Sequence, residues 1–405
     1  MALRTLFLTG AAIGAAVLGA AAFGQAKGGP AVYWMSADTV SGFGALAADG
    51  GRPSAGAVMG AMMGRGGGGG ASYSRTLTLQ LGSPQRPAGA PSAEHLPPGG
   101  LLAGPSLPLI TPQGVARPVG PAQPWSGQME KPRGRMLIYW GCGEHARPGQ
   151  PAVIDFASLS AGKMPPAFAS AMLKPMTPPS GATFTTYGEW PNERTKSRVP
   201  KAGSLVGEHV VRGNYSPEMR FTLGPGQDFL APVGLTANAP APSGSVPLVW
   251  RPVPGARAWF AATMGSGANG DFVMWSSSEA QAAAMAVDYV AEADLPRLIQ
   301  QRALMPASAD RCTVPAEVAR AAPQSMLMLI AFGGEANFVQ PKPAGTPASW
   351  RPAWTAKLRT KSTHMGLLGM TMPGIDDSAG QGPGDPAQPK KKKSKLGRIR
   401  DIMGQ

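Results

Sequence analysis

The residues best suited to chemistry lie at positions 142 to 145, where the sequence reads Cys-Gly-Glu-His. A cysteine becomes a nucleophile when a nearby base or cation holds it as the thiolate, and His145 is the nearest candidate base. The only other cysteine is Cys312, and distant cysteines commonly pair in exported proteins. The sequence favours a Cys142–Cys312 disulfide, and an exported enzyme with a Cys142–His145 site is the alternative.

Methionine suggests a second kind of site, because the chain holds 21 of these residues. Thioether sulfurs suit copper(I), although methionine also fills irregular cores. The clusters comprise Met59, Met62 and Met63, and then His364, Met365, Met370 and Met372. Spacings typical of zinc sites are absent from the sequence. We therefore assign no metal ligands and expect no cofactor, and a periplasmic metal-binding protein is a further alternative.

Several common catalytic motifs are missing from the sequence. There is no Gly-x-Ser-x-Gly elbow of the kind that presents a hydrolase serine, and no phosphate-binding Gly-x-x-x-x-Gly-Lys-Ser/Thr loop. These absences favour a non-catalytic protein with a binding or scaffolding role.

The N-terminal residues predict export. Arg4 precedes an apolar run from Leu6 to Phe23, and Gly24-Gln25-Ala26 fits the small-residue pattern of a cleavage site. We interpret residues 1–26 as a signal peptide, with an uncleaved membrane anchor as the alternative. No later apolar stretch is long enough to span a bilayer. The expected location is the periplasm, the outer surface or the extracellular space of a bacterial-type envelope.

The C-terminal residues carry much of the net charge of +14. Within the predicted disordered tail, 371–405, the cations are Lys390, Lys391, Lys392, Lys393, Lys395, Arg398 and Arg400. As a helix, the last of these residues would form a short basic amphipathic segment that lies on an anionic surface; a solvated tail is the alternative. The expected partner is an anionic envelope surface or another envelope protein. No specific nucleic-acid binding is expected, since interleaved aromatic residues are absent, and the oligomeric state stays open.

Composition and strand-like runs predict a mainly β fold. Gly and Pro number 55 and 43 of 405 residues, which leaves little room for long helices. Short apolar or alternating runs recur between turn residues, which favours antiparallel sandwiches. The expected strands include 75–81, 136–140, 153–156, 183–187, 207–215, 219–223 and 326–332, with short helices near 294–304 and 313–322.

Two sandwich-like β domains are expected, at 71–235 and 236–370. Residues 27–70 are rich in Gly and Met and are interpreted as a flexible linker. Within that range, the short apolar piece from Ala31 to Met35 is a candidate to pair with a later strand.

One local stretch resembles a known family. Pro247-Leu-Val-Trp250-Arg-Pro252-Val-Pro254-Gly255-Ala256-Arg-Ala-Trp259 is similar to the second strand, turn and third strand of a fibronectin type III domain. Trp259 occupies the position where that family typically has tyrosine. The resemblance covers residues 247–276 and implies a β-sandwich for 236–370, with Trp250 in its core.

Overall fold

The computed structural model describes residues 29–48, 73–112, 134–155, 176–195, 198–280 and 288–370. These residues form a mainly β structure with three sheets and a few short helices. The mainly β prediction is therefore confirmed. The predicted signal peptide and polybasic tail lie outside the described residues.

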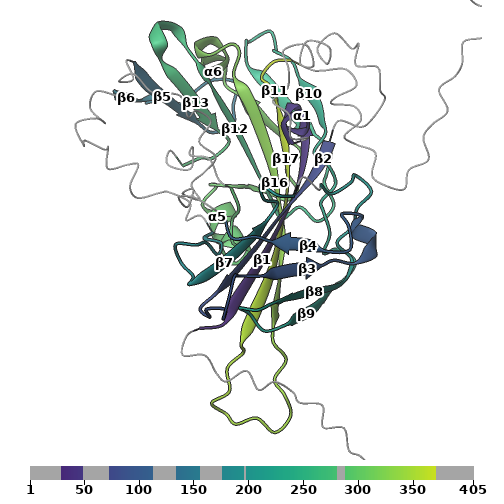
Figure 1. Cartoon of the computed structure of the whole chain (residues 1–405). Helices are drawn as coiled ribbons and strands as arrows, with labels where there is room; N and C mark the ends of the chain where they lie inside the picture. Colours follow the sequence, from purple (N-terminus) through teal and green to yellow (C-terminus); the bar gives the residue numbers. More distant parts are fainter. Residues whose placement is uncertain are drawn as a thin grey trace, which may run out of the picture.

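One long central sheet runs through the whole molecule (Figure 1). Its strand order is β6-β5-β13-β12-β16-β17-β1-β2-β7, and the short β14 (Met305–Pro306) pairs with β12. The bounds are β1 Ala31–Gly42, β2 Tyr73–Ser83, β5 Arg135–Trp140, β6 Ala152–Asp155, β7 Thr186–Trp190, β12 Ala258–Ser266, β13 Phe272–Ser276, β16 Met326–Val339 and β17 Trp354–Leu367. Most pairings are antiparallel, but β1 with β17 and β5 with β13 are parallel.

Two smaller sheets cover different parts of the central sheet. The first has the order β4-β3-β8-β9, and the second has the order β10-β11-β15. Their bounds are β3 Ala93–Leu96, β4 Leu107–Leu109, β8 Gly207–Gly213, β9 Met219–Leu223, β10 Leu235–Asn238, β11 Val246–Trp250 and β15 Arg311–Val314. The sheet of β3, β4, β8 and β9 together with the part of the central sheet that it covers is called the lower sandwich. The sheet of β10, β11 and β15 together with the part that it covers is called the upper sandwich (Figure 1).

Each sandwich has its own apolar core, made by alternation along the strands. In β9, Met219, Phe221 and Leu223 are buried while Arg220 and Thr222 face solvent. Such a period of two places one side of a strand on the core. The long strand β16 contributes to both cores, since Ala336 joins the lower core and Leu329 joins the upper one, while Leu358 of β17 joins the lower core.

Trp250 and Trp259, the two tryptophans of residues 247–259, pack against each other across the upper sandwich. Trp250 lies on β11 and Trp259 on β12, with ring centroids 5.3 Å apart. Both rings are buried, and each indole N–H donates to a backbone carbonyl, that of Ala309 for Trp250 and that of Ala307 for Trp259. Trp250 therefore fills the core as the resemblance implies.

Helices are short and lie at strand ends. The helices are α1 Phe43–Ala48, α5 Leu295–Gln300 and α6 Ala316–Ala321, with 3-10 turns η1 Gly99–Leu101, η2 Ala268–Gly270 and η4 Glu292–Asp294. The two predicted helices are present as α5 and α6, each shorter than expected. Among the described residues, none of the helices has the length and apolar character that crossing a membrane requires.

The interpretation of residues 27–70 as a flexible linker needs correction for residues 31–48. Residues 31–42 form β1, which lies between β17 and β2 in the central sheet. Tyr33, Met35 and Ala37 are fully buried, because they alternate toward the lower core. Gly42 then takes a positive φ of 69° to turn the chain into α1, where a Cβ would lie 2.1 Å from the Met365 carbonyl oxygen. Residues 49–70 lie outside the described part of the chain.

Strands from both predicted domain ranges share the central sheet. β5 and β6, from the first range, extend the sheet beside β13 of the upper sandwich. β17, from the second range, pairs with β1 and packs on the lower core. The two sandwich cores are therefore built from interleaved segments.

Candidate functional site

The two cysteines are joined in a disulfide, with Cα atoms 5.3 Å apart. Cys142 follows β5 at the end of the central sheet, and Cys312 lies within β15 of the small upper sheet. The bond therefore joins the two sheets of the upper sandwich, and it is the pairing that the sequence favours. Because neither sulfur is a free thiol, the arrangement holds no cysteine nucleophile for the Cys142–His145 alternative.

His145 instead pairs with α6 at the surface. Its Nδ1 lies 3.2 Å from Oε1 of Glu317, and the backbone N–H of Ala146 donates to Oε2 at 2.8 Å. The Ala146 amide, with His145 as a smaller contributor, holds the pKa of Glu317 below its ordinary value. This exposed contact fixes the loop after Cys142 onto α6.

Most of the other predicted site residues lie outside the part of the chain that the structure describes. The seven tail cations and Met59, Met62, Met63 and Met372 lie outside the described residues. His364 is buried within β17, where its Nδ1 lies 3.1 Å from Oγ of Ser41. Within the described ranges, no three His, Cys, Asp or Glu side chains converge in a way that would hold a metal ion.

A buried chain of polar side chains crosses the lower core. Leu205 accepts a hydrogen bond from Nε2 of His209 at 2.6 Å, and Nδ1 of His209 lies 3.0 Å from Nε2 of His95. The Tyr33 hydroxyl oxygen lies 2.6 Å from Nδ1 of His95. A carbonyl can only accept, so Nε2 of His209 carries a proton. With both imidazoles neutral, Nε2–H of His95 donates to Nδ1 of His209 and the Tyr33 hydroxyl donates to Nδ1 of His95.

The surroundings keep these imidazoles neutral. Both histidines are fully buried, and His209 stacks on Phe221 with ring centroids 5.4 Å apart. Burial lowers the pKa of His95, with a smaller contribution from His209, and burial also lowers the pKa of His209. Sequence reasoning missed this chain; the one available signal is that both histidines stand at inward positions of short strands.

A second polar cluster lies on the opposite face of the central sheet. Arg359 of β17 is buried, with its guanidinium carbon 4.0 Å from the ring centroid of Tyr289 and 5.0 Å from that of Trp34. Its Nε donates to Oγ of Ser36 at 2.7 Å, while Nη1 has no hydrogen-bond partner among the described residues. Contact with two aromatic faces is what stabilises this cation.

Carboxylates balance the lysines on either side of Arg359. Lys357 pairs with Glu335, and Lys361 lies 2.6 Å from Asp288 and 3.6 Å from Asp38. Burial raises the pKa of Asp38, and Lys361 opposes that change. Together with Arg359, these ion pairs form an internal network that holds residues 288–292 on the central sheet.

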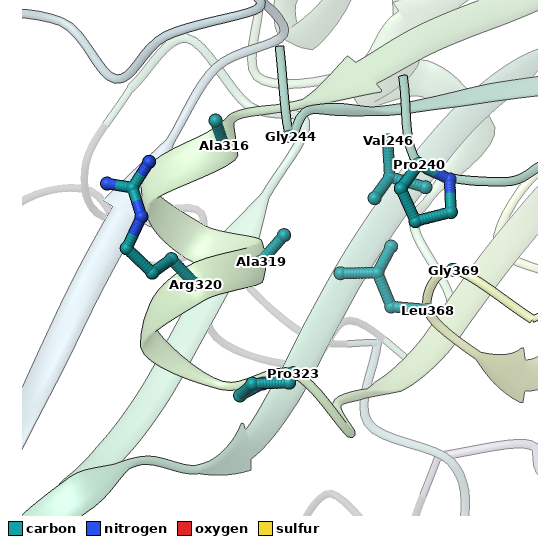
Figure 2. Close-up of a pocket in the computed structure, with 9 residues that line it drawn as sticks. All are labelled: Pro240, Gly244, Val246, Ala316, Ala319, Arg320, Pro323, Leu368 and Gly369. Carbon is teal, nitrogen blue, oxygen red and sulfur yellow. The ribbon is translucent and has the colours of Figure 1, made fainter. Parts of the chain in front are cut away.

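One shallow apolar recess of about 280 Å³ lies beside α6 (Figure 2). Figure 2 shows Leu368 and Ala319 on facing sides and Arg320 directed away from the recess. The lining residues are Pro240, Gly244, Val246, Ala316, Ala319, Arg320, Pro323, Leu368 and Gly369. This set contains no carboxylate, imidazole, hydroxyl or thiol, so the recess has no group for acid–base or nucleophilic catalysis.

The described surfaces thus offer a disulfide-linked β framework, two internal polar networks and one apolar recess. Comparison of the chain with known protein families, with curated proteins and with solved structures found no match in any of the three.

Proposed function

We propose that this protein is an exported, non-catalytic envelope or surface protein that binds or scaffolds through its sheets and loops. The observation that carries the proposal is the Cys142–Cys312 disulfide, which uses both cysteines of the chain. Such bonds persist in oxidising compartments outside the cytoplasm. The apolar run from Leu6 to Phe23 supports the same destination.

The arrangement of the upper sandwich supports a binding role of the fibronectin type III-like kind. Consecutive strands β11 and β12 lie in opposite sheets, as the second and third strands of immunoglobulin-like sandwiches do. β10, β11 and β15 form one layer, and β13, β12, β16 and β17 form the other. Sandwiches of this kind use their connecting loops for recognition. This layout favours recognition by surface loops over chemistry in an enclosed pocket.

Export makes a direct prediction about the thiols. The full chain, expressed in a bacterial host, is expected in the exported fraction, shortened near residue 26 and without alkylatable thiols. A chain that lacks residues 1–26 is expected in the cytoplasm with both thiols reduced, because that compartment opposes disulfide formation. Cell fractionation followed by alkylation and mass spectrometry measures both. An intact chain in the cytoplasm with two free thiols would contradict the proposal.

The polybasic tail is the proposed contact with an anionic envelope surface. Each cation near such a surface contributes about 1 kcal/mol, so seven cations give strong, salt-sensitive attraction. Replacing Lys390, Lys391, Lys392, Lys393, Lys395, Arg398 and Arg400 with Gln is expected to reduce sedimentation with anionic vesicles at least tenfold. Zwitterionic vesicles are the control, and equal sedimentation of both proteins would reject this role of the tail.

A further inference from the structure

β1 and β17, the first and last described strands along the chain, begin at the same end of the central sheet. β1 and β17 are parallel, with Ala31 opposite Trp354, and the Ala31 N–H donates to the Ala353 carbonyl at 2.9 Å. The connection between β16 and β17, residues 340–353, lies at this end; we call it the hairpin loop. Figure 1 shows the hairpin loop extending past the start of β1. Whatever precedes β1 therefore enters the fold beside this loop.

The hairpin loop is exposed and carries positive charge alone. Its 14 residues contain Lys342 and Arg351, four prolines and no Asp or Glu. Both cations are exposed, and neither forms an ion pair with any described residue. Net positive charge without internal compensation attracts an anionic surface.

A tryptophan stands next to one of these cations. The backbone N–H of Trp350 donates to the Pro347 carbonyl at 3.0 Å, and Arg351 Nη1 donates to the Trp350 carbonyl at 3.1 Å. Trp350 is partly exposed, which leaves part of an amphipathic indole at the surface. Tryptophan with nearby Lys or Arg is the combination enriched where proteins meet lipid headgroups.

A second connection at this end has the same charge character. β2 runs antiparallel to β1, so it ends near Val32, and residues 84–92 follow it. This segment contains Arg86 and no acidic residue. Three strand spacings separate β2 from β16, which amounts to about 14 Å. The hairpin loop and residues 84–92 thus form one end face with three uncompensated cations.

We propose that this end face docks on the anionic headgroups of a lipid bilayer, with the hairpin loop as the main contact. The inference rests on the proposed export, because the apolar run Leu6–Phe23 precedes Ala31 by only seven residues. An extended link of that length spans about 25 Å, so before cleavage near residue 26 the bilayer that holds the run lies within reach of the loop. That adjacency, together with Trp350, favours lipid over an acidic protein as the partner.

This contact is distinct from the one proposed for the polybasic tail. The described chain ends at Met370, just after the other end of β17. A 14-residue strand places those two ends about 45 Å apart. Because residues 371–389 separate Met370 from the first tail cation, neutralising the tail cations, and not the position of a probe alone, separates docking by the loop from docking by the tail.

A single-site fluorescent label tests the proposal. Ser349→Cys places a reactive thiol on the exposed hairpin loop, and the native cysteines do not compete because they are disulfide-bonded. The full chain carrying an environment-sensitive fluorophore there is reconstituted with vesicles of phosphatidylcholine, alone or mixed with phosphatidylglycerol. We expect a blue shift that appears only with phosphatidylglycerol. The same label at the exposed Ser266→Cys, at the far end of β12, is expected to shift much less.

Substitutions in the loop complete the test. The double change Lys342→Gln and Arg351→Gln, and separately Trp350→Ala, are each expected to reduce the blue shift at Ser349→Cys by more than half. The matched control changes two exposed cations elsewhere, Arg194→Gln with Arg251→Gln, and is expected to leave the shift unchanged.

Each remaining outcome decides the question. A shift that persists in both loop variants but disappears when the seven tail cations are neutralised assigns docking to the tail and overturns the proposal. The absence of any shift with phosphatidylglycerol also overturns it. Because the vesicle measurement does not depend on where the cell places the protein, failed docking is distinguishable from failed export.

Discussion

Lowering the pH from 7 to 5 is expected to remove about 2 kcal/mol of folding free energy through His364 alone. Burial lowers the pKa of this residue to about 4, whereas an unfolded chain holds its histidines near 6.5. The unfolded state therefore binds the proton first as the pH falls. The contribution of His364 is fully present above pH 6.5 and is lost progressively between pH 6.5 and 4.

The buried pair in the lower core acts in the same direction. The pKa values of His95 and His209 are lowered by burial, so the proton again favours the unfolded chain. Geometry adds a specific reason. With Leu205 as a fixed acceptor, an added proton on His209 sets its Nδ1–H against Nε2–H of His95 across 3.0 Å. Relieving this contact requires His95 to change tautomer, so that the hydrogen bonds from His209 through His95 to Tyr33 all reverse direction. We expect this pair to add to the loss from His364.

Urea unfolding at pH 7, 6 and 5 measures this prediction. His364→Asn is expected to flatten part of the pH dependence, since asparagine keeps a polar group near Ser41 without titrating. His145→Asn is the matched control, because His145 lies exposed on Glu317. A wild-type stability that is constant from pH 7 to 5 would show that these imidazoles are not held neutral.

Removing the disulfide is the second large effect. The Cys142–Cys312 bond closes a loop of 170 residues, for which the chain-entropy relation gives about 5 kcal/mol. That value is a large share of the total stability of an ordinary domain. The double variant Cys142→Ala with Cys312→Ala is therefore expected to unfold at a much lower denaturant concentration, through the greater freedom of its unfolded state.

Equilibrium unfolding of three samples separates the effect of losing the disulfide from the effect of replacing the two side chains. The oxidised wild type, the reduced wild type and the double alanine variant are compared at one pH. Reduced wild type and variant are expected to agree within about 1 kcal/mol, because alanine is small enough to occupy the partly apolar site beside the upper core. A loss below about 1 kcal/mol in both would mean that the bond contributes little to the fold.

Local patterns predicted several strands correctly. The alternation at 219–223 coincides with β9, and the apolar run at 136–140 lies within β5. In these segments the residue pattern agrees with the burial that the fold imposes, so a short window suffices. The disulfide was likewise predictable, because two cysteines allow only one intramolecular pairing.

The largest error concerned β1. The expectation that Ala31–Met35 pairs with a later strand is confirmed, but the glycine-rich sequence that follows led to the whole range being interpreted as a linker. The strand is stabilised by partners 30 or more residues away on one side and more than 300 away on the other. Its burial comes from β2, β17 and the lower core together. Composition alone carries no information about such partners, which is why local propensity yielded to tertiary context.

By itself, the sequence determined the mainly β character, the cysteine pairing and the concentration of cations in the tail, since each depends on composition or on a short pattern. Only the tertiary structure decided that two sandwiches share one sheet, that His95 meets His209, and that the hairpin loop lies beside the start of β1. These features depend on contacts between residues that lie from 114 to more than 300 positions apart. Strand order and register bring such residues together, and neither is encoded in a local window.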